Sequence, residues 1–326
     1  MKTDSFHGLC FSIIYQKEYI EYKDNYRINN LINILNIKFK NSTVINYSEI
    51  YNNIEYERKR TLDYFNNICM FKYACYSKDK VTHDLSTSGG ICAELARYTF
   101  NNNGIVYGAS YNKDFSRVNI IKVDNIEDYF KYISKSKYNF SFLPKLEIIK
   151  KELDDGQNIL YIGSPCQIVS IKKYLKKDYN NLILIDFKCY GFSSNKKLLD
   201  FVNNIKNKYK QNIKKIDFRP EHKVRIDVTL EDDTIINFDK KIAKHFYMDT
   251  IDKCKKCLFD HGKKLSQSDI TVGDIWCNSH DVMKLGTDFT PENGCNIVRT
   301  NTLKGLLFFD KIKNKLNIKQ LSKDCY

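Results

Sequence analysis

The sequence predicts an α/β protein, with a mostly parallel sheet flanked by helices and a smaller antiparallel β-containing appendage. From residue 105 onward, short apolar runs typical of strands alternate with segments whose apolar residues recur at helical spacing. Two alternating runs, 224–230 and 234–238, then flank the turn Glu231-Asp232-Asp233, which predicts an antiparallel hairpin. The 326 residues suffice to bury a sizeable core.

The change from alternating helices and strands to the hairpin predicts three parts of the chain. Residues 1–68 form an N-terminal segment with no assigned role, and residues 69–215 form an α/β part. Residues 216–326 form a C-terminal part that holds the hairpin, a CxxC pair and the strand SDITVGDIW.

Composition narrows the class of protein. The net charge is +14, and its lysines are spread along helices, which favours solvated helix faces over either an anionic cofactor or partner or nucleic acid. No apolar run approaches the roughly 18 residues of a membrane span, and the amino terminus lacks a signal-peptide core. We therefore expect a cytoplasmic protein. Its eleven cysteines then favour metal or iron–sulfur ligation over disulfides.

Apolar spacing and turn residues predict the other elements in order. Helices are expected at 91–100, 125–132, 146–153, 196–208, 241–251 and 302–313, and strands at 105–109, 118–123, 213–218, 268–276 and 296–300. The tail beyond residue 313 is polar.

The central unit of the chain is a strand, helix and strand over residues 159–187. A crossover helix makes its two strands parallel neighbours. Cys166 follows the first strand and Cys189 follows the second, so both thiols are expected at the carboxyl edge of the sheet, where α/β proteins bind ligands. Two thiols at one edge indicate a metal or redox centre.

The turn Ser86–Gly90 (STSGG) opens a predicted helix. Free backbone N–H groups at such a helix start suit a phosphate, although a capped helix start explains the same residues more often. The Ser134–Tyr138 loop (SKSKY) has two explanations as well, either a grip on a phosphate or ring, or a solvated basic loop.

Cys254 and Cys257 form the CxxC pair, which is consistent with a redox dithiol, half of a zinc site or half of a cluster site. No thioredoxin-like unit surrounds the pair. A zinc site usually has a second pair about 15–20 residues further on, where this chain has the single Cys277. Alternatively, Cys166 and Cys189 complete the site with the CxxC pair, if the fold returns this segment to the edge of the sheet. Trp276, which ends a predicted strand, lies against a flavin ring or caps the core.

Seven stretches in a fixed order resemble the beta-subunit family of coenzyme F420 hydrogenases and dehydrogenases. They are STSGG at 86–90, GIVYGASY at 104–111, SKSKY at 134–138, GSPCQ at 163–167, KCYG at 188–191, CKKC at 254–257 and SDITVGDIW at 268–276. Together they cover about residues 69 to 313.

This resemblance implies an iron–sulfur flavoprotein that passes electrons between a [4Fe–4S] cluster, a flavin such as FAD, and a partner. Coenzyme F420, a nicotinamide and a ferredoxin are the candidate donors or acceptors, and a small molecule is the substrate. The implied cluster ligands are Cys166, Cys189, Cys254 and Cys257. The implied flavin-binding residues are Ser86, Ser88, Gly89, Gly90, Lys137 and Tyr138. Ser136 of the same loop and Trp276 at its strand end are further candidates for contact with the flavin.

Three departures from the family pattern matter. A two-cluster ferredoxin segment, common ahead of this region in relatives, is absent, so a separate ferredoxin or redox subunit is an expected partner. Cys277 stands where a glycine follows the tryptophan in relatives, which makes it an alternative ligand. Some bacterial relatives are associated with surface-polysaccharide genes, so a polysaccharide context is a second expectation and coenzyme F420 use does not follow from membership.

A rival hypothesis belongs to another class of protein. In it, Cys254, Cys257, Cys277 and one further ligand bind a structural zinc in a non-catalytic scaffold whose basic surface binds an anionic partner.

Overall fold

The computed structural model describes residues 2–3, 20–21, 71–137, 139, 141–255, 257, 267–275 and 285–321. The chain divides into two compact units, Met1–Cys69 and Met70–Tyr326. In the first unit, strands β1 (Lys2–Thr3) and β2 (Ile20–Glu21) pair in parallel. The second unit carries all seven motif stretches, so the fold that positions the site is the fold of this unit.

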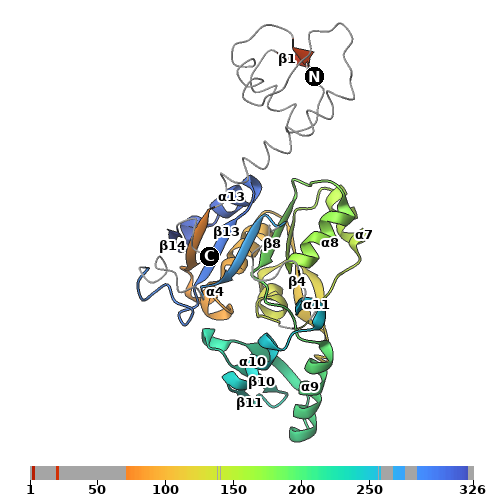
Figure 1. Cartoon of the computed structure of the whole chain (residues 1–326), viewed down its shortest axis with the longest axis vertical. Coiled ribbons are helices and arrows are strands. Elements are labelled where there is room, and N and C mark those ends of the chain that lie inside the picture. The colour runs from red at the N-terminus through yellow and green to blue at the C-terminus, as the bar shows by residue number, and fades with distance from the viewer. Residues whose placement is uncertain are drawn as a thin grey trace. The chain divides into compact units, whose positions relative to one another are not determined.

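A nine-stranded sheet forms the centre of the second unit (Figure 1). Its strand order is β14-β3-β13-β12-β8-β7-β4-β5-β6. The run from β12 through β8 and β7 to β4 is parallel, and antiparallel pairings join strands on both sides of it. The bounds are β3 (Lys72–Ser77), β4 (Ile105–Tyr111), β5 (Val118–Val123), β6 (Ser141–Phe142), β7 (Ile159–Gly163), β8 (Leu182–Phe187), β12 (Ile270–Asp274), β13 (Asn296–Thr300) and β14 (Leu316–Leu321).

The predicted central unit is confirmed. β7 and β8 are parallel neighbours, with Ile159 opposite Leu182 and Gly163 opposite Asp186, and α8 (Pro165–Leu175) connects them. The carboxyl ends of both strands therefore lie at one edge of the sheet.

Helices cover both faces of the sheet. Alternate residues of each strand point to opposite faces, so Leu160 joins a core cluster with α5 (Ile91–Asn101) and α13 (Leu303–Asp310). Its neighbour Tyr161 joins a second cluster with α7 (Leu146–Asp154) and α8. Burial on both faces explains why β8 is a continuous apolar run rather than an alternating one.

A smaller antiparallel sheet forms the predicted appendage, which α9 (Asn195–Tyr209) and α10 (Lys240–Met248) accompany at one end of the unit (Figure 1). Its strands are β9 (Ile213–Phe218), β10 (Ile226–Leu230) and β11 (Ile235–Phe238), in the order β11-β10-β9. Leu198, Val202 and Phe246 pack from the helices into one apolar cluster with its inner face. The α/β class with a separate antiparallel sheet is thus confirmed.

Short elements complete the described fold. They are α4 (Lys80–Leu85), α6 (Ile126–Asp128), the π-helix η1 (Tyr129–Ile133), the 3₁₀ helices η2 (Pro220–His222) and η4 (Lys313–Lys315), and α11 (Asp252–Lys255). Across the part of the chain that the structure describes, no helix has the length and apolar character of a membrane span.

Candidate functional site

Cys166 is placed by a well-capped helix start. Ser164 and Gln167 form a capping box, in which the Ser164 N–H donates to Gln167 Oε1 at 2.9 Å, and Pro165 takes the first helical position. The Gln167 amide is fixed in turn by bonds to Ser141. Cys166 is exposed, and its Sγ lies 3.1 Å from the Ser164 hydroxyl. Its thiol is therefore presented at the carboxyl edge of the sheet.

Cys189 lies just beyond the end of β8, and its thiol accepts the backbone N–H of Gly191 at 3.4 Å. Gly191 has a φ of 101°, and a Cβ there would lie 2.7 Å from Thr250 Cγ2 and 3.0 Å from Cys254 Cβ. Glycine at this position thus lets the turn after β8 approach the CxxC segment closely.

Backbone hydrogen bonds attach the CxxC pair to the same turn. The Ile251 N–H donates to the Phe192 carbonyl at 2.9 Å, and the Cys254 N–H donates to the Ile251 carbonyl at 2.9 Å. The Cys257 N–H then donates to the Cys254 carbonyl at 3.1 Å. The pair is held beside Cys189 even though more than sixty positions separate them in sequence.

The four predicted ligand cysteines lie close enough to influence one another's charge. Burial, together with negative charge at Cys166, Cys254 and Cys257, raises the pKa of the Cys189 thiol to about 12, although the hydrogen bond from the Gly191 N–H acts in the opposite direction. The pKa of Cys254 is also raised by burial, with contributions from Cys166 and Cys257, while a hydrogen bond from the Phe192 backbone lowers it. Deprotonating these thiols together is unfavourable unless a positively charged centre compensates the charge.

Four cysteine thiols are a donor set that suits either a [4Fe–4S] cluster or a structural zinc ion. Within the described residues, no three cysteine, histidine or carboxylate side chains are grouped closely enough to hold one metal ion. A zinc ion needs all its sulfurs within about 2.3 Å of one atom, whereas a [4Fe–4S] cluster holds its four thiolates around a larger body. Backbone N–H groups that donate to the Cys189 and Cys254 sulfurs are of the kind that tunes such clusters.

The STSGG loop connects α4 to α5, and it opens a helix as predicted. Gly90 caps α5 in a left-handed conformation, with a φ of 77°. Gly89 packs against the sheet, where a Cβ would lie 2.7 Å from both the Cys75 carbonyl and Asn296 Oδ1. Ser86 Oγ donates to the Thr82 carbonyl and Ser88 Oγ to the Cys295 carbonyl. Both hydroxyl protons are therefore engaged within the protein, and phosphate binding by the backbone N–H groups of the helix start stays a prediction.

The 134–137 segment lies directly on this loop. The Ser134 hydroxyl donates to the Leu85 carbonyl at 3.0 Å, and the Ser136 N–H donates to Thr87 Oγ1 at 2.9 Å. Lys135 Nζ lies 3.3 Å from the Ser86 carbonyl. Two motifs that were singled out separately in the sequence thus form one surface.

Lys137 has its ammonium turned toward the backbone. Its Nζ donates to the carbonyls of Tyr132 and Ile133 at 2.8 and 2.7 Å, at the end of η1. Burial lowers its pKa to about 7, although Asp217 acts in the opposite direction. Tyr138, Trp276 and Cys277 lie outside the described residues. The roles of all the named residues in binding a cluster or a flavin stay predictions.

The loop after β9 contacts the STSGG loop, and sequence analysis missed it. His222 Nδ1 lies 3.2 Å from the Thr87 carbonyl, and the His222 ring lies 4.6 Å from that of His83. Arg219, 2% exposed, forms an ion pair with Asp274 at the end of β12. Arg219 and His222 both have a positive φ, so this turn is strained as well as buried.

Positively charged side chains surround the contact between His222 and the STSGG loop. Burial lowers the pKa of His222, while the contact with the Thr87 carbonyl raises it and positive charge at His83, Lys135 and Arg219 lowers it further. Lys135 lies 3.6 Å from Asp217, which partly offsets its charge. No local pattern in the sequence announces these residues, because the contact joins positions more than 130 apart.

Comparisons with known proteins agree with this architecture. The family model that matches describes the C-terminal part of the beta subunit of coenzyme F420 hydrogenase/dehydrogenase, and it covers residues 156–324, which is more than half of the chain. The comparison with curated proteins finds no match.

Among solved structures, the chain is similar to a chain of the F420-reducing [NiFe] hydrogenase complex from Methanosarcina barkeri. The TM-score is 0.52 at 18% identity, over 76% of this chain and 81% of that chain. At this identity the similarity shows a shared fold. The family model, in contrast, matches more than half of the chain. The chain therefore belongs to the beta-subunit family of coenzyme F420 hydrogenases and dehydrogenases, a family of oxidoreductase subunits.

Proposed function

We propose that this chain is an iron–sulfur flavoprotein oxidoreductase that passes electrons between a [4Fe–4S] cluster, a flavin and a partner. The observation that carries the proposal is that four cysteines from three segments lie near one another at the carboxyl edge of the central strands β7 and β8. The Ile251–Phe192 hydrogen bond holds the CxxC segment to the turn after β8. Negative charge at Cys166 raises the pKa of both Cys189 and Cys254, so the Cys166 thiol lies near these two.

Each part of the chain has a defined task in this proposal. The four thiolates hold the cluster, while Gly191 and Phe192 donate backbone N–H groups that tune it. The STSGG loop and the 134–137 segment bind the flavin phosphates through backbone N–H groups and positive charge. The bound groups supply one-electron transfer at the cluster and two-electron hydride chemistry at the flavin.

The electron donor or acceptor is a reduced deazaflavin, a nicotinamide or a ferredoxin-type protein, and the substrate is a small molecule. Family membership supports a partner protein with a redox role, and the similar solved chain is itself part of a hydrogenase complex. Coenzyme F420 as the donor and the polysaccharide context stay predictions.

Anaerobic purification with metal and flavin analysis tests the proposal. We expect brown protein with about four irons and four sulfides per chain, following Cys₄ ligation of a [4Fe–4S] cluster, together with one bound flavin. Protein that holds zinc and neither iron nor flavin after reconstitution would instead support the zinc-stabilised scaffold and overturn the proposal.

A further inference from the structure

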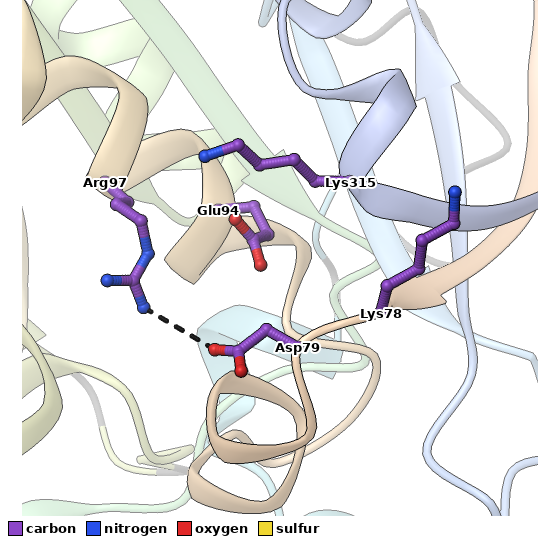
Figure 2. A pocket seen from close by; sticks show the side chains of 5 residues that line it. All are labelled: Lys78, Asp79, Glu94, Arg97 and Lys315. Atoms are coloured by element: carbon purple, nitrogen blue, oxygen red, sulfur yellow. Dashed lines mark ion pairs between the residues drawn. The ribbon is translucent and has the colours of Figure 1, made fainter.

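A pocket of about 440 Å³, to whose lining none of the four cysteines contributes, lies between the end of β3, helix α5 and the turn that leads into β14 (Figure 2). Five side chains line it, and all of them are charged: Lys78, Asp79, Glu94, Arg97 and Lys315. Among the described residues, no aromatic or aliphatic side chain contributes to this lining. The charged ends of these side chains suit a small charged molecule.

Glu94 is the most unusual member of this lining. It is 2% exposed, and it lies in the first turn of α5 with its carboxylate directed into the pocket (Figure 2). Within the part of the chain that the structure describes, its single partner is the Ser77 hydroxyl, which donates to Oε1 at 2.5 Å. A buried carboxylate with one neutral partner leaves a second oxygen available for a cation or a strong donor.

The cations of the pocket are not arranged to neutralise Glu94. Arg97 donates to Thr82 Oγ1 at 2.9 Å and lies 3.9 Å from Asp79, which pairs these two residues with each other (Figure 2). Lys78 Nζ donates to the Asn314 carbonyl at 3.0 Å.

Lys315 is the remaining cation. Its ammonium makes neither a hydrogen bond nor an ion pair with any residue that the structure describes, and Figure 2 shows its chain extending across the pocket near Glu94 and Arg97. The pocket therefore presents one unneutralised carboxylate and one unneutralised ammonium to the same space.

We propose that this pocket binds a small zwitterion, whose ammonium group contacts Glu94 and whose anionic group contacts Lys315. The ligand thus pairs an opposite charge with Glu94 and another with Lys315, two protein groups that form no ion pair with each other. The anionic group is a carboxylate, as in an α-amino acid, or a phosphate, as in a phosphorylated amino alcohol. Both share the chemistry that the pocket recognises.

Isothermal titration of the full chain with L-alanine and with O-phosphoethanolamine tests the proposal. We expect at least one probe to bind, and Glu94→Gln and Lys315→Met each to raise its Kd about tenfold, or about 1.4 kcal/mol. Propionate and propylamine, which each carry one of the two charges, should bind at least about tenfold more weakly than the zwitterion.

Matched variants make the result specific. Glu147→Gln on α7 and Lys311→Met beside α13 change the same residue types at exposed positions and should leave the Kd unchanged. Lys315 is exposed, so its replacement tests the pocket even if the Glu94 variant does not fold. Absence of binding by both zwitterions at millimolar concentration, or an unchanged Kd in Lys315→Met, overturns the proposal. The probe that binds identifies the anionic group.

Discussion

At the scale of single residues, Gly191 shows how one backbone position allows a site to form. Its φ of 101° is costly for any other residue, and a side chain there would meet Thr250 and the Cys254 Cβ. The approach of the turn after β8 to the CxxC segment therefore depends on the missing side chain.

We expect Gly191→Ala to lower the free energy of unfolding by about 1–3 kcal/mol through backbone strain and to reduce the iron bound per chain. Urea unfolding and iron analysis measure the two effects. Gly156→Ala is the matched control, because Gly156 has a φ of 86° with no atom within 4 Å of the added Cβ. Gly156→Ala should lower the free energy of unfolding through backbone strain and bind as much iron per chain as the wild type. Equal iron in both variants would contradict the close approach.

Lys137 offers a test based on pH. Burial lowers its pKa to about 7, whereas lysine in an unfolded chain titrates near about 10.4. Between these values the unfolded chain holds a proton that the folded chain has released, so this residue makes the free energy of unfolding rise with pH.

Lys137→Met should remove that contribution, so its unfolding free energy should rise less than that of the wild type between pH 7 and 10. Urea titrations across this range measure the difference. Lys173→Met, at an exposed position on α8, should keep the wild-type pH dependence. The same pH dependence in wild type and Lys137→Met would show that the ammonium is not buried.

At the scale of elements, the loop between β9 and β10 connects the small sheet to the large one. Its Arg219 pairs with Asp274 at the end of β12, and its His222 contacts the STSGG loop at Thr87. Three left-handed residues in this turn, Arg219, Glu221 and His222, store strain that the surrounding contacts must offset.

Removing one partner of the Arg219–Asp274 pair should be costly, because Arg219 is almost fully buried. We expect Arg219→Met to lower the free energy of unfolding by about 3–5 kcal/mol and Asp274→Asn to act in the same direction. The double variant should lose less than the sum of the two single effects. A purely additive double-mutant cycle in urea unfolding would show that the pair does not couple the two sheets.

At the scale of the whole molecule, local patterns predicted most elements, but not the contacts that join them. β5 and β13 have the expected bounds, and the parallel β7–β8 pair follows from the length of its crossover. β14 was not predicted, because Lys319 and Gln320 make this edge strand polar and only its pairing with β3 reveals it.

The same distinction holds for the candidate site. The four cysteines were predicted because thiols after strand ends and a CxxC pair are chemically distinctive. His222 and Arg219 were missed because their importance lies in contacts with Thr87 and Asp274, far away in the chain. The pocket around Glu94 was missed for the same reason, since three separate segments supply its charges.

The central claim is that Cys166, Cys189, Cys254 and Cys257 hold one cluster. The most direct test is to measure the iron bound per chain in the four single Cys→Ser variants after anaerobic purification. Cys92→Ser, purified in the same way, is the control. The account predicts about four irons in the wild type and the Cys92 variant and a marked loss in each of the other four. Full iron in any one of those four variants would contradict it.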